Sequence, residues 1–257
     1  MSRGHPRSGK KLRISLAAIL LAAGALIVNP QSAYSIRGGN NVTDSSMDYV
    51  ARVQHSLGLS CTGTLIAPQW VLTAAHCVGG EPNAGNFTIT LGTHERNVAG
   101  QRFTGIGVYD YPGYRGAHND VALLKLDHPA QNIQPMQLAS PSQHAYWDGQ
   151  QRGPFTQYDD GVIAGWGTNG NGWPDFLQFK GVSIMPTVPD GDKWPMIPVS
   201  AGPCGGDSGG PLMVVIGGQL YQVGVLKAGD CNDSGGNYSD VGQGVLRNWV
   251  TSTMAAH

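Results

Sequence analysis

The sequence has few charged residues and no cluster of basic ones beyond its first 13 positions. Asp, Glu, Lys and Arg make up 13% of the 257 residues, and the formal net charge is −1. A protein that binds nucleic acid usually carries a basic patch or stripe, and that feature is missing here. Nor does any segment after residue 28 form an apolar run of the roughly 20 residues that a membrane-spanning helix needs.

The first 35 residues do not resemble part of a fold. Residues 1–13 carry five basic residues and no acid, residues 14–28 are mostly apolar, and Ala33 and Ser35 precede Ile36 by three and one positions. This pattern predicts a secretory signal peptide, residues 1–35, cleaved before Ile36. An uncleaved membrane anchor is the alternative, but the apolar run is shorter than a span requires. We therefore expect a secreted, extracellular protein, and the long charged leader indicates a bacterial exporter.

The chain that remains after signal removal is acidic. Removing five of the 16 Lys and Arg residues leaves 11 against 17 acids, so the net charge falls to about −6. A mildly acidic surface is compatible with a soluble extracellular protein. We expect a monomer with no nucleic-acid partner and no membrane contact once the signal is removed. The remaining length allows one large β domain or two small ones.

Cysteine is scarce, and its spacing argues against a metal centre. The four cysteines are Cys61, Cys77, Cys204 and Cys231, and no two of them form a C-x-x-C pair. Because secretion permits disulfides, we expect two bridges and no metal or other cofactor. Four cysteines allow three pairings, and their spacing alone does not choose among them.

Glycine and proline are abundant, and short β-prone segments recur between them. The chain holds 38 Gly and 16 Pro, and the β-prone segments are residues 49–54, 62–66, 70–73, 87–91, 121–126, 162–164, 212–216 and 222–226. This arrangement predicts an all-β sandwich or barrel. The polar segment 128–143 is a predicted linker between two halves. Apolar residues at helical spacing between Val245 and Met254 predict a closing helix.

Three motifs carry residues suited to covalent catalysis. They are Gly-Asp-Ser-Gly-Gly-Pro around Ser208, Thr-Ala-Ala-His-Cys around His76, and Asn-Asp-Val-Ala-Leu-Leu around Asp120. A serine hydroxyl is a weak nucleophile and needs an adjacent base. Histidine exchanges protons near neutral pH, and a buried aspartate can orient it. Together the motifs resemble the chymotrypsin/trypsin-like serine peptidase family, in which the three residues follow in this order.

The motif around Ser208 also fits G-x-S-x-G, the nucleophile elbow of α/β-hydrolases. Those enzymes place the acid and the histidine after the serine. Only 49 residues follow Ser208 here, and their single histidine is His257. The order of the residues therefore argues against that fold.

The family resemblance covers nearly all of the chain after residue 35 and implies a fold and a set of roles. The fold would be two packed six-stranded antiparallel β-barrels, about residues 36–135 and 136–257, with a C-terminal α-helix. Ser208 would attack protein or peptide substrates, with His76 as base and Asp120 as its orienting acid. The N–H groups of Gly206 and Ser208 would form the oxyanion hole. The resemblance also implies the disulfides Cys61–Cys77 and Cys204–Cys231.

The resemblance gives Asp207 a separate role. In the family this acid pairs with the amine of a newly formed N-terminus, which usually reads Ile-Val-Gly-Gly. This chain has Ile36-Arg37-Gly38-Gly39, directly after the predicted signal cleavage site. We hypothesise that signal removal itself produces the activating amine of Ile36. Arg37 departs from the family pattern and must extend to solvent beside the insertion pocket.

Substrate selection is predicted from three glycines. Gly202 occupies the position where trypsin-like members carry an Asp, so selection of basic residues is not expected. Gly229 and Gly236 align with the pocket walls and predict an open, uncharged slot for a large apolar residue.

Two acids lie in the same loop as this slot. Asp230 and Asp233 would favour a basic residue if they faced it. Lys227 and Ala228 replace the family's usual Ser and Trp. Such departures leave a second hypothesis open, a catalytically impaired binding protein with a peptidase fold.

Overall fold

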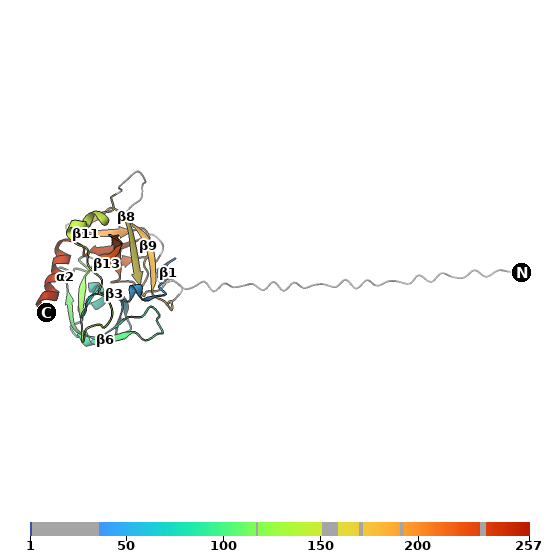
Figure 1. The fold of residues 1–257 in the computed structure, drawn as a ribbon, viewed down its shortest axis with the longest axis horizontal. Coiled ribbons are helices and arrows are strands. Elements are labelled where there is room, and N and C mark those ends of the chain that lie inside the picture. The colour runs from blue at the N-terminus through green and yellow to red at the C-terminus, as the bar shows by residue number, and fades with distance from the viewer. Residues whose placement is uncertain (2–35, 117, 151–158, 170–171, 191–192, 232–234) are drawn as a thin grey trace. The chain divides into compact units, whose positions relative to one another are not determined.

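The structure is a computed structural model, and it describes residue 1 and residues 36–116, 118–150, 159–169, 172–190, 193–231 and 235–257. The predicted signal peptide lies outside the described residues except for Met1. The described part of the chain from Ile36 onward is built mostly of β-strands (Figure 1).

The first half of the chain forms a closed antiparallel barrel. Its six strands are β2 (Val50–His55), β3 (Ser60–Ala67), β4 (Trp70–Thr73), β5 (Phe87–Leu91), β6 (Gln101–Asp110) and β7 (Ala122–Leu126). The strand order around the barrel is β2-β3-β4-β7-β6-β5, and the pairing of β2 with β5 closes it. Closure leaves no unpaired strand edge in this half.

The second half forms another antiparallel barrel from β8 (Asp159–Gly165), β9 (Gln178–Ile184), β11 (Lys193–Val199), β12 (Pro211–Ile216), β13 (Gln219–Gly229) and β14 (Gly236–Asp240). The sheet runs β9-β8-β12-β13-β14-β11, and the pairing of Val199 with Ile184 joins its two ends. The short strands β1 (Asn40–Asn41) and β10 (Val188–Asp190) extend it at β9 and β11. The predicted fold of two six-stranded barrels is confirmed.

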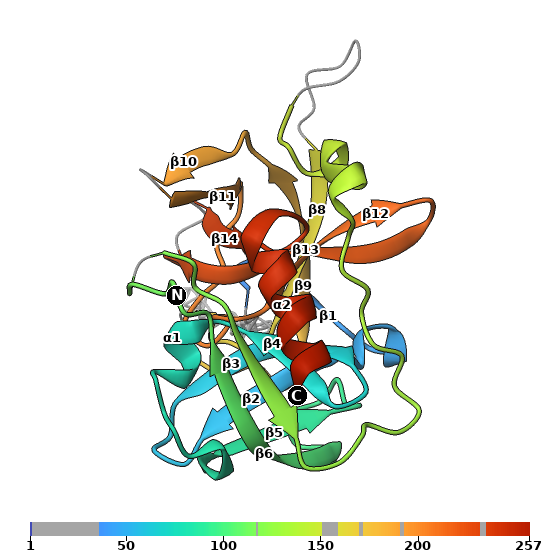
Figure 2. The same cartoon turned by 90° about the vertical axis from the view of Figure 1, so that its left-hand side faces the viewer.

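Helices are few. They are α1 (Ala75–Val78), α2 (Gly244–Ala256) and the 3-10 turns η1 (Ser45–Met47), η2 (Ala84–Asn86) and η3 (Pro141–Tyr146). The predicted closing helix is α2, and it crosses the face of the molecule that Figure 2 presents. None of the described helices is long and apolar enough to cross a bilayer.

The two barrels pack on each other through buried side chains. One buried cluster joins Leu72 and Val121 of the first half to Val225 of β13 and Leu246 of α2. Trp166, directly after β8, packs into the core of the first barrel and donates its indole N–H to the carbonyl of Val50 at 3.1 Å. These contacts hold the loops at the junction of the barrels in a fixed relation, and the candidate site lies at that junction.

Candidate active site

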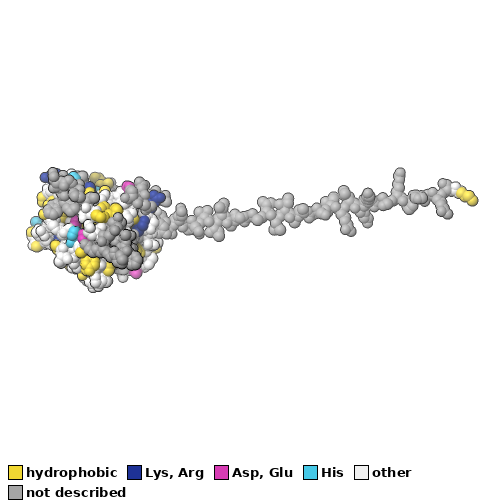
Figure 3. Space-filling model, turned by 90° about the horizontal axis from the view of Figure 1, so that it is seen from above, with side chains coloured by type: hydrophobic (Ala, Val, Ile, Leu, Met, Phe, Trp, Pro, Cys, Tyr) yellow, Lys and Arg dark blue, Asp and Glu magenta, His cyan; other side chains and the backbone are white. Residues whose placement is uncertain are grey.

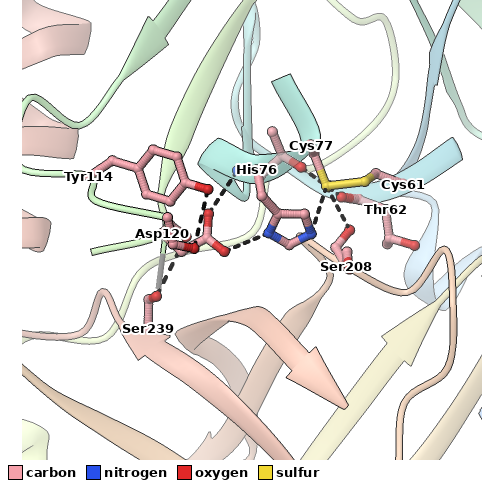
Figure 4. Close-up of polar contacts among 10 residues, drawn as sticks. Cys61, Thr62, His76, Cys77, Tyr114, Asp120, Ser208 and Ser239 are labelled. Atoms are coloured by element: carbon pink, nitrogen blue, oxygen red, sulfur yellow. Dashed lines mark hydrogen bonds and ion pairs between the residues drawn. A yellow bond between two sulfur atoms is a disulfide. The ribbon is translucent and has the colours of Figure 1, made fainter. Parts of the chain in front are cut away.

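His76 and Asp120 meet through two hydrogen bonds. His76 lies on the single turn α1, and its Nδ1 is 2.5 Å from Oδ2 of Asp120, while its backbone N–H donates to Oδ1 at 2.8 Å. An ionised carboxylate only accepts hydrogen bonds, so the proton of the neutral ring belongs on Nδ1. That tautomer leaves Nε2 free to accept a proton. Figure 4 shows Ser208 beside the ring on the side away from Asp120.

The two side chains differ in their exposure, and the difference suits their roles. The side chain of Asp120 is 1% exposed, whereas that of His76 is 33% exposed. Asp120 follows Asn119, whose φ of 55° turns the chain just before β7. Ser239 of β14 donates to the backbone carbonyl of Asp120 at 3.5 Å, so the second barrel also contacts this segment (Figure 4).

Two further ionisable groups lie near Asp120. Burial, and then the charges of Asp120 and Asp110, raise the pKa of Tyr114. Asp110 ends β6, and burial followed by the charge of Asp120 raises the pKa of its carboxyl. Its Oδ1 is buried and has no hydrogen-bond partner among the described residues. The position of Tyr114 and Asp110 near Asp120 was not predicted from the sequence.

The backbone around Ser208 is held by both barrels. Its carbonyl accepts a hydrogen bond from the N–H of Thr62 in β3 at 2.8 Å. The N–H of Gly209 donates to the carbonyl of Leu226 in β13 at 2.8 Å. A β-carbon at Gly209 would lie 2.2 Å from Oγ1 of Thr73, so only glycine allows this approach. Ser208 is therefore fixed by neighbours on each side.

Gly206 and Ser208 present backbone donors with no partner among the described residues. The carbonyl of Gly206 accepts a hydrogen bond from the hydroxyl of Thr62 at 2.9 Å. The φ of Gly206 is +93°, a conformation that other residues rarely adopt. Neither N–H donates to a described backbone or side-chain acceptor. Two such N–H groups beside a nucleophile are suited to binding an oxyanion.

Asp207 points away from Ser208 into the protein and is fully buried. Its Oδ1 accepts the N–H of Gly167 at 2.7 Å, and its Oδ2 accepts the N–H of Cys204 at 2.8 Å. Burial raises the pKa of Asp207 to about 7, although these two hydrogen bonds and the charge of Arg96 lower it in part. β-Carbons at Gly165 and Gly167 would lie 2.1 and 2.7 Å from Oδ1, so both glycines make room for this carboxyl.

Ile36, the predicted partner of Asp207, is buried in the core of the second barrel. In this chain its nitrogen is a peptide amide, and no hydrogen bond or ion pair joins it to Asp207 among the described residues. Arg37 is exposed, as expected, and its Nη1 donates to the carbonyl of Cys231 at 3.4 Å. The structure thus buries both members of the predicted activation pair without joining them.

Two disulfides brace the loops of the site. Cys61 pairs with Cys77, and Cys204 pairs with Cys231, which are the pairings that the family resemblance implies. The first joins β3 to the turn that carries His76, and the second joins the segment before Asp207 to the end of β13. Cys61 and Cys77 also lie near His76 in a cluster of possible metal ligands. Because both sulfurs are in the disulfide, they offer no thiolate to a metal ion.

The ring of Pro203 packs against both glycines of the predicted slot. Gly229 and Gly236 face each other across β13 and β14, and a β-carbon on either would lie within 2.8 Å of the Pro203 ring. The absence of side chains at the two glycines thus allows the close approach of Pro203. The opening of the slot to a large apolar residue stays a prediction. Gly202, at the position of the family's Asp, is buried and brings no charge.

Lys227 and Ala228 lie near the end of β13. Lys227 is the extra residue of a bulge in β13, and no hydrogen bond or ion pair joins it to Asp120 among the described residues. Ala228 is exposed and lines a hollow of about 320 Å³ together with Pro198, Asn237 and the two slot glycines, Gly229 and Gly236. The small side chain of Ala228 leaves this hollow unfilled. Asp230 is exposed at its rim, and Asp233 lies outside the described residues.

Most of the chain matches one known protein family. The family model described as Trypsin matches residues 36–250. The chain belongs to the trypsin family. As a member of that family it is a hydrolase of the serine endopeptidase type. The trypsin match begins at Ile36, the residue that follows the predicted signal peptide.

Three similar proteins span nearly the whole chain. Granzyme M of Homo sapiens is 31% identical over 84% of this chain and 87% of its own length. A trypsin-like protease of Streptomyces glaucescens is 30% identical over 93% and 91%. A trypsin of Xenopus laevis is 30% identical over 82% and 86%.

The trypsin motifs alone did not show which neighbours support the site. Thr62 was predicted only as a strand residue, yet its hydroxyl bonds Gly206 and also accepts the N–H of Trp166 at 3.0 Å. Such a contact depends on how two barrels dock, so no local pattern reports it. Gly165 and Gly167 likewise have their reason in the fold, because their lack of side chains allows the approach of Asp207.

Proposed function

We propose that this trypsin-family protein is a secreted endopeptidase that uses Ser208, His76 and Asp120 as its catalytic residues. The observation that carries the proposal is the 2.5 Å contact of His76 Nδ1 with Asp120, with Ser208 beyond the other ring nitrogen. Nε2 takes the hydroxyl proton while the serine oxygen bonds to the substrate carbonyl carbon. The imidazolium then gives that proton to the leaving amine, and water releases the acyl group by the same steps.

The free N–H groups of Gly206 and Ser208 support a second part of the mechanism. The carbonyl oxygen becomes negative as the serine attacks, and two N–H donors held in place stabilise that charge. Losing one such donor costs about 3–4 kcal/mol in the barrier. Because the groups of the site all come from one chain, a monomer suffices. The proposed steps require no cofactor, nucleic acid or membrane.

The proposed substrates are proteins and peptides with an uncharged residue before the cleaved bond. Gly202 supports the absence of charge selection, since it offers no carboxylate to a Lys or Arg side chain. The scattered charges on the face shown in Figure 3 form no patch of one sign there.

Incubation of the mature protein with an unfolded protein substrate tests this function. We expect cleavage at internal peptide bonds, with new N-termini after uncharged residues, and no cleavage by the Ser208→Ala variant. If the wild-type protein binds the substrate but yields no new N-termini, it is a binding protein with a peptidase fold and the proposal is wrong.

The proposed maturation is removal of residues 1–35 in one step. Its support is that the trypsin match starts at Ile36 and that Ile36 and Asp207 are both buried. We predict that the protein recovered from the medium starts with Ile36-Arg37-Gly38. N-terminal sequencing checks this prediction, and a start at any other residue contradicts it.

A further inference from the structure

The Pro203 ring lies directly against the two glycines that form the walls of the slot. Gly229 and Gly236 are register partners in β13 and β14. A β-carbon on Gly229 would lie 2.5 Å from Cγ of Pro203, and one on Gly236 would lie 2.8 Å from its Cδ. Distances this short mean that the ring already contacts the backbone of both glycines.

Bonds on either side fix the position of the ring. The carbonyl of Pro203 accepts the N–H of Cys231 at 3.3 Å, and the neighbouring Cys204 is joined to Cys231 by a disulfide. The N–H of Cys204 donates to Asp207 at 2.8 Å. The proline ring also restricts its own φ to near −65°. Pro203 is therefore held on both sides and cannot leave the slot by a side-chain rotation.

A flat aromatic side chain would need room between the Pro203 ring and the two glycines. Carbon atoms in contact lie about 3.5–4 Å apart, so a flat ring between two walls needs roughly twice that separation. In this structure the Pro203 ring lies against the backbone of Gly229 and Gly236, so these two sides of the slot are in contact. A small side chain makes no such demand, since it ends near the mouth of the slot.

We propose that Pro203 determines the specificity of this peptidase by closing the slot to large side chains, so that cleavage follows small residues such as alanine and valine. The inference rests on the proposed endopeptidase function and refines its substrate class. Gly202 beside it supplies no charge, so neither a basic nor an acidic side chain gains by entering.

A series of peptide amides tests the role of Pro203 in the mature enzyme. The peptides differ only in the residue before the cleaved bond, which is Ala, Val, Phe or Lys. We expect kcat/KM to be at least about tenfold higher for Ala than for Phe, the range that pocket size commonly gives. The Pro203→Ala variant removes Cγ and Cδ, and we expect it to raise kcat/KM for Phe at least about tenfold with little change for Ala.

A matched control and covalent labelling separate the possible failures. Pro68→Ala makes the same substitution between β3 and β4 of the first barrel, away from the slot, and should leave the ratio of Phe to Ala unchanged. A wild-type enzyme that cleaves after Phe as well as after Ala overturns the role of Pro203, even if Pro203→Ala fails to fold. An unchanged ratio in folded Pro203→Ala also overturns it. Failure of the proposed function looks different, because Ser208 would then not react with a sulfonyl fluoride.

Discussion

Replacing Ser208 or His76 with alanine is expected to lower kcat by about 10⁶-fold in the mature protein. Without the hydroxyl no acyl bond forms, and without the imidazole no group takes the hydroxyl proton. The double variant should be no worse than either single variant, because the two residues act as one unit. Steady-state hydrolysis of an alanine amide, normalised to folded protein by circular dichroism, measures these losses.

Asp120→Asn provides a graded form of the same prediction. An amide can donate to the ring as well as accept, so it no longer holds the proton on Nδ1, and we expect a loss of about 10⁴-fold. Asp110→Asn is the matched control, because Asp110 shares the electrostatic surroundings of Asp120 but makes no hydrogen bond to His76. Its effect should stay below about tenfold. Equal losses in the two variants would contradict the assignment of Asp120.

The second large effect concerns the buried carboxyl of Asp207. While Ile36 remains joined to Ser35, the free energy of unfolding should fall as the pH rises from about 4 to about 7. The folded state holds the proton of Asp207 up to a pKa of about 7, whereas the unfolded chain releases it near its ordinary value of 3.8. Between these values the unfolded state binds fewer protons, so stability declines with pH by about 1.4 kcal/mol per unit, roughly 4 kcal/mol in all.

Maturation should remove most of this pH dependence. The free amine of Ile36 would bring a positive charge into the protein, and an opposite charge favours the ionised carboxyl. We therefore expect the mature form to lose far less stability between pH 4 and 7. Urea unfolding of both forms, each carrying Ser208→Ala to prevent self-cleavage, measures the difference. Identical slopes in the two forms would rule out the activation pair.

Asp207→Asn separates the carboxyl from other sources of pH dependence. In the form joined to Ser35 it should abolish most of the decline, because no ionisable group is then buried at this position. The amide nitrogen cannot accept a hydrogen bond, so one of the two backbone bonds to residue 207 is lost at every pH. In the mature form the same substitution should lower both stability and activity, because the amine would lack its partner. Asp175→Asn changes an exposed acid in the same way and should alter neither slope.

The sequence predicted the strands that combine β-branched residues with clear turn signals. β4 and β5 begin and end at the predicted residues. β6 was not predicted, because Gly105 and Gly107 interrupt its pattern. A β-carbon at Gly105 would lie 2.6 Å from the carbonyl of Ala84, so η2 packs against the strand at this glycine. Glycine in a strand often marks the close approach of another segment, but the sequence does not show which segment approaches.

Strands with proline or many polar residues were also missed. β11 contains Pro195 and Pro198, and β14 reads Gly-Asn-Tyr-Ser-Asp. Both strands owe their place to pairing with each other and with β9 and β13. Local propensity is a weak guide where tertiary pairing dominates.

The three proposed catalytic residues were named from sequence because each lies in a distinctive motif. The packing of Pro203 against the slot glycines was not predicted, although Pro203 stands between Gly202 and Cys204 in the sequence. The direction of its ring depends on the disulfide to Cys231 and on the hydrogen bond from Cys204 to Asp207. Both are contacts that form only in the fold, so the sequence does not show that the Pro203 ring packs against the two glycines.

Covalent labelling of Ser208 tests the central claim most directly. The mature protein is incubated with a sulfonyl fluoride, digested, and analysed by mass spectrometry. We predict a single adduct, located at Ser208 in the peptide that contains Gly206–Pro211, and no adduct at that serine over the same time in His76→Ala. A folded wild-type protein with unmodified Ser208, or with equal labelling in His76→Ala, would contradict the proposed mechanism.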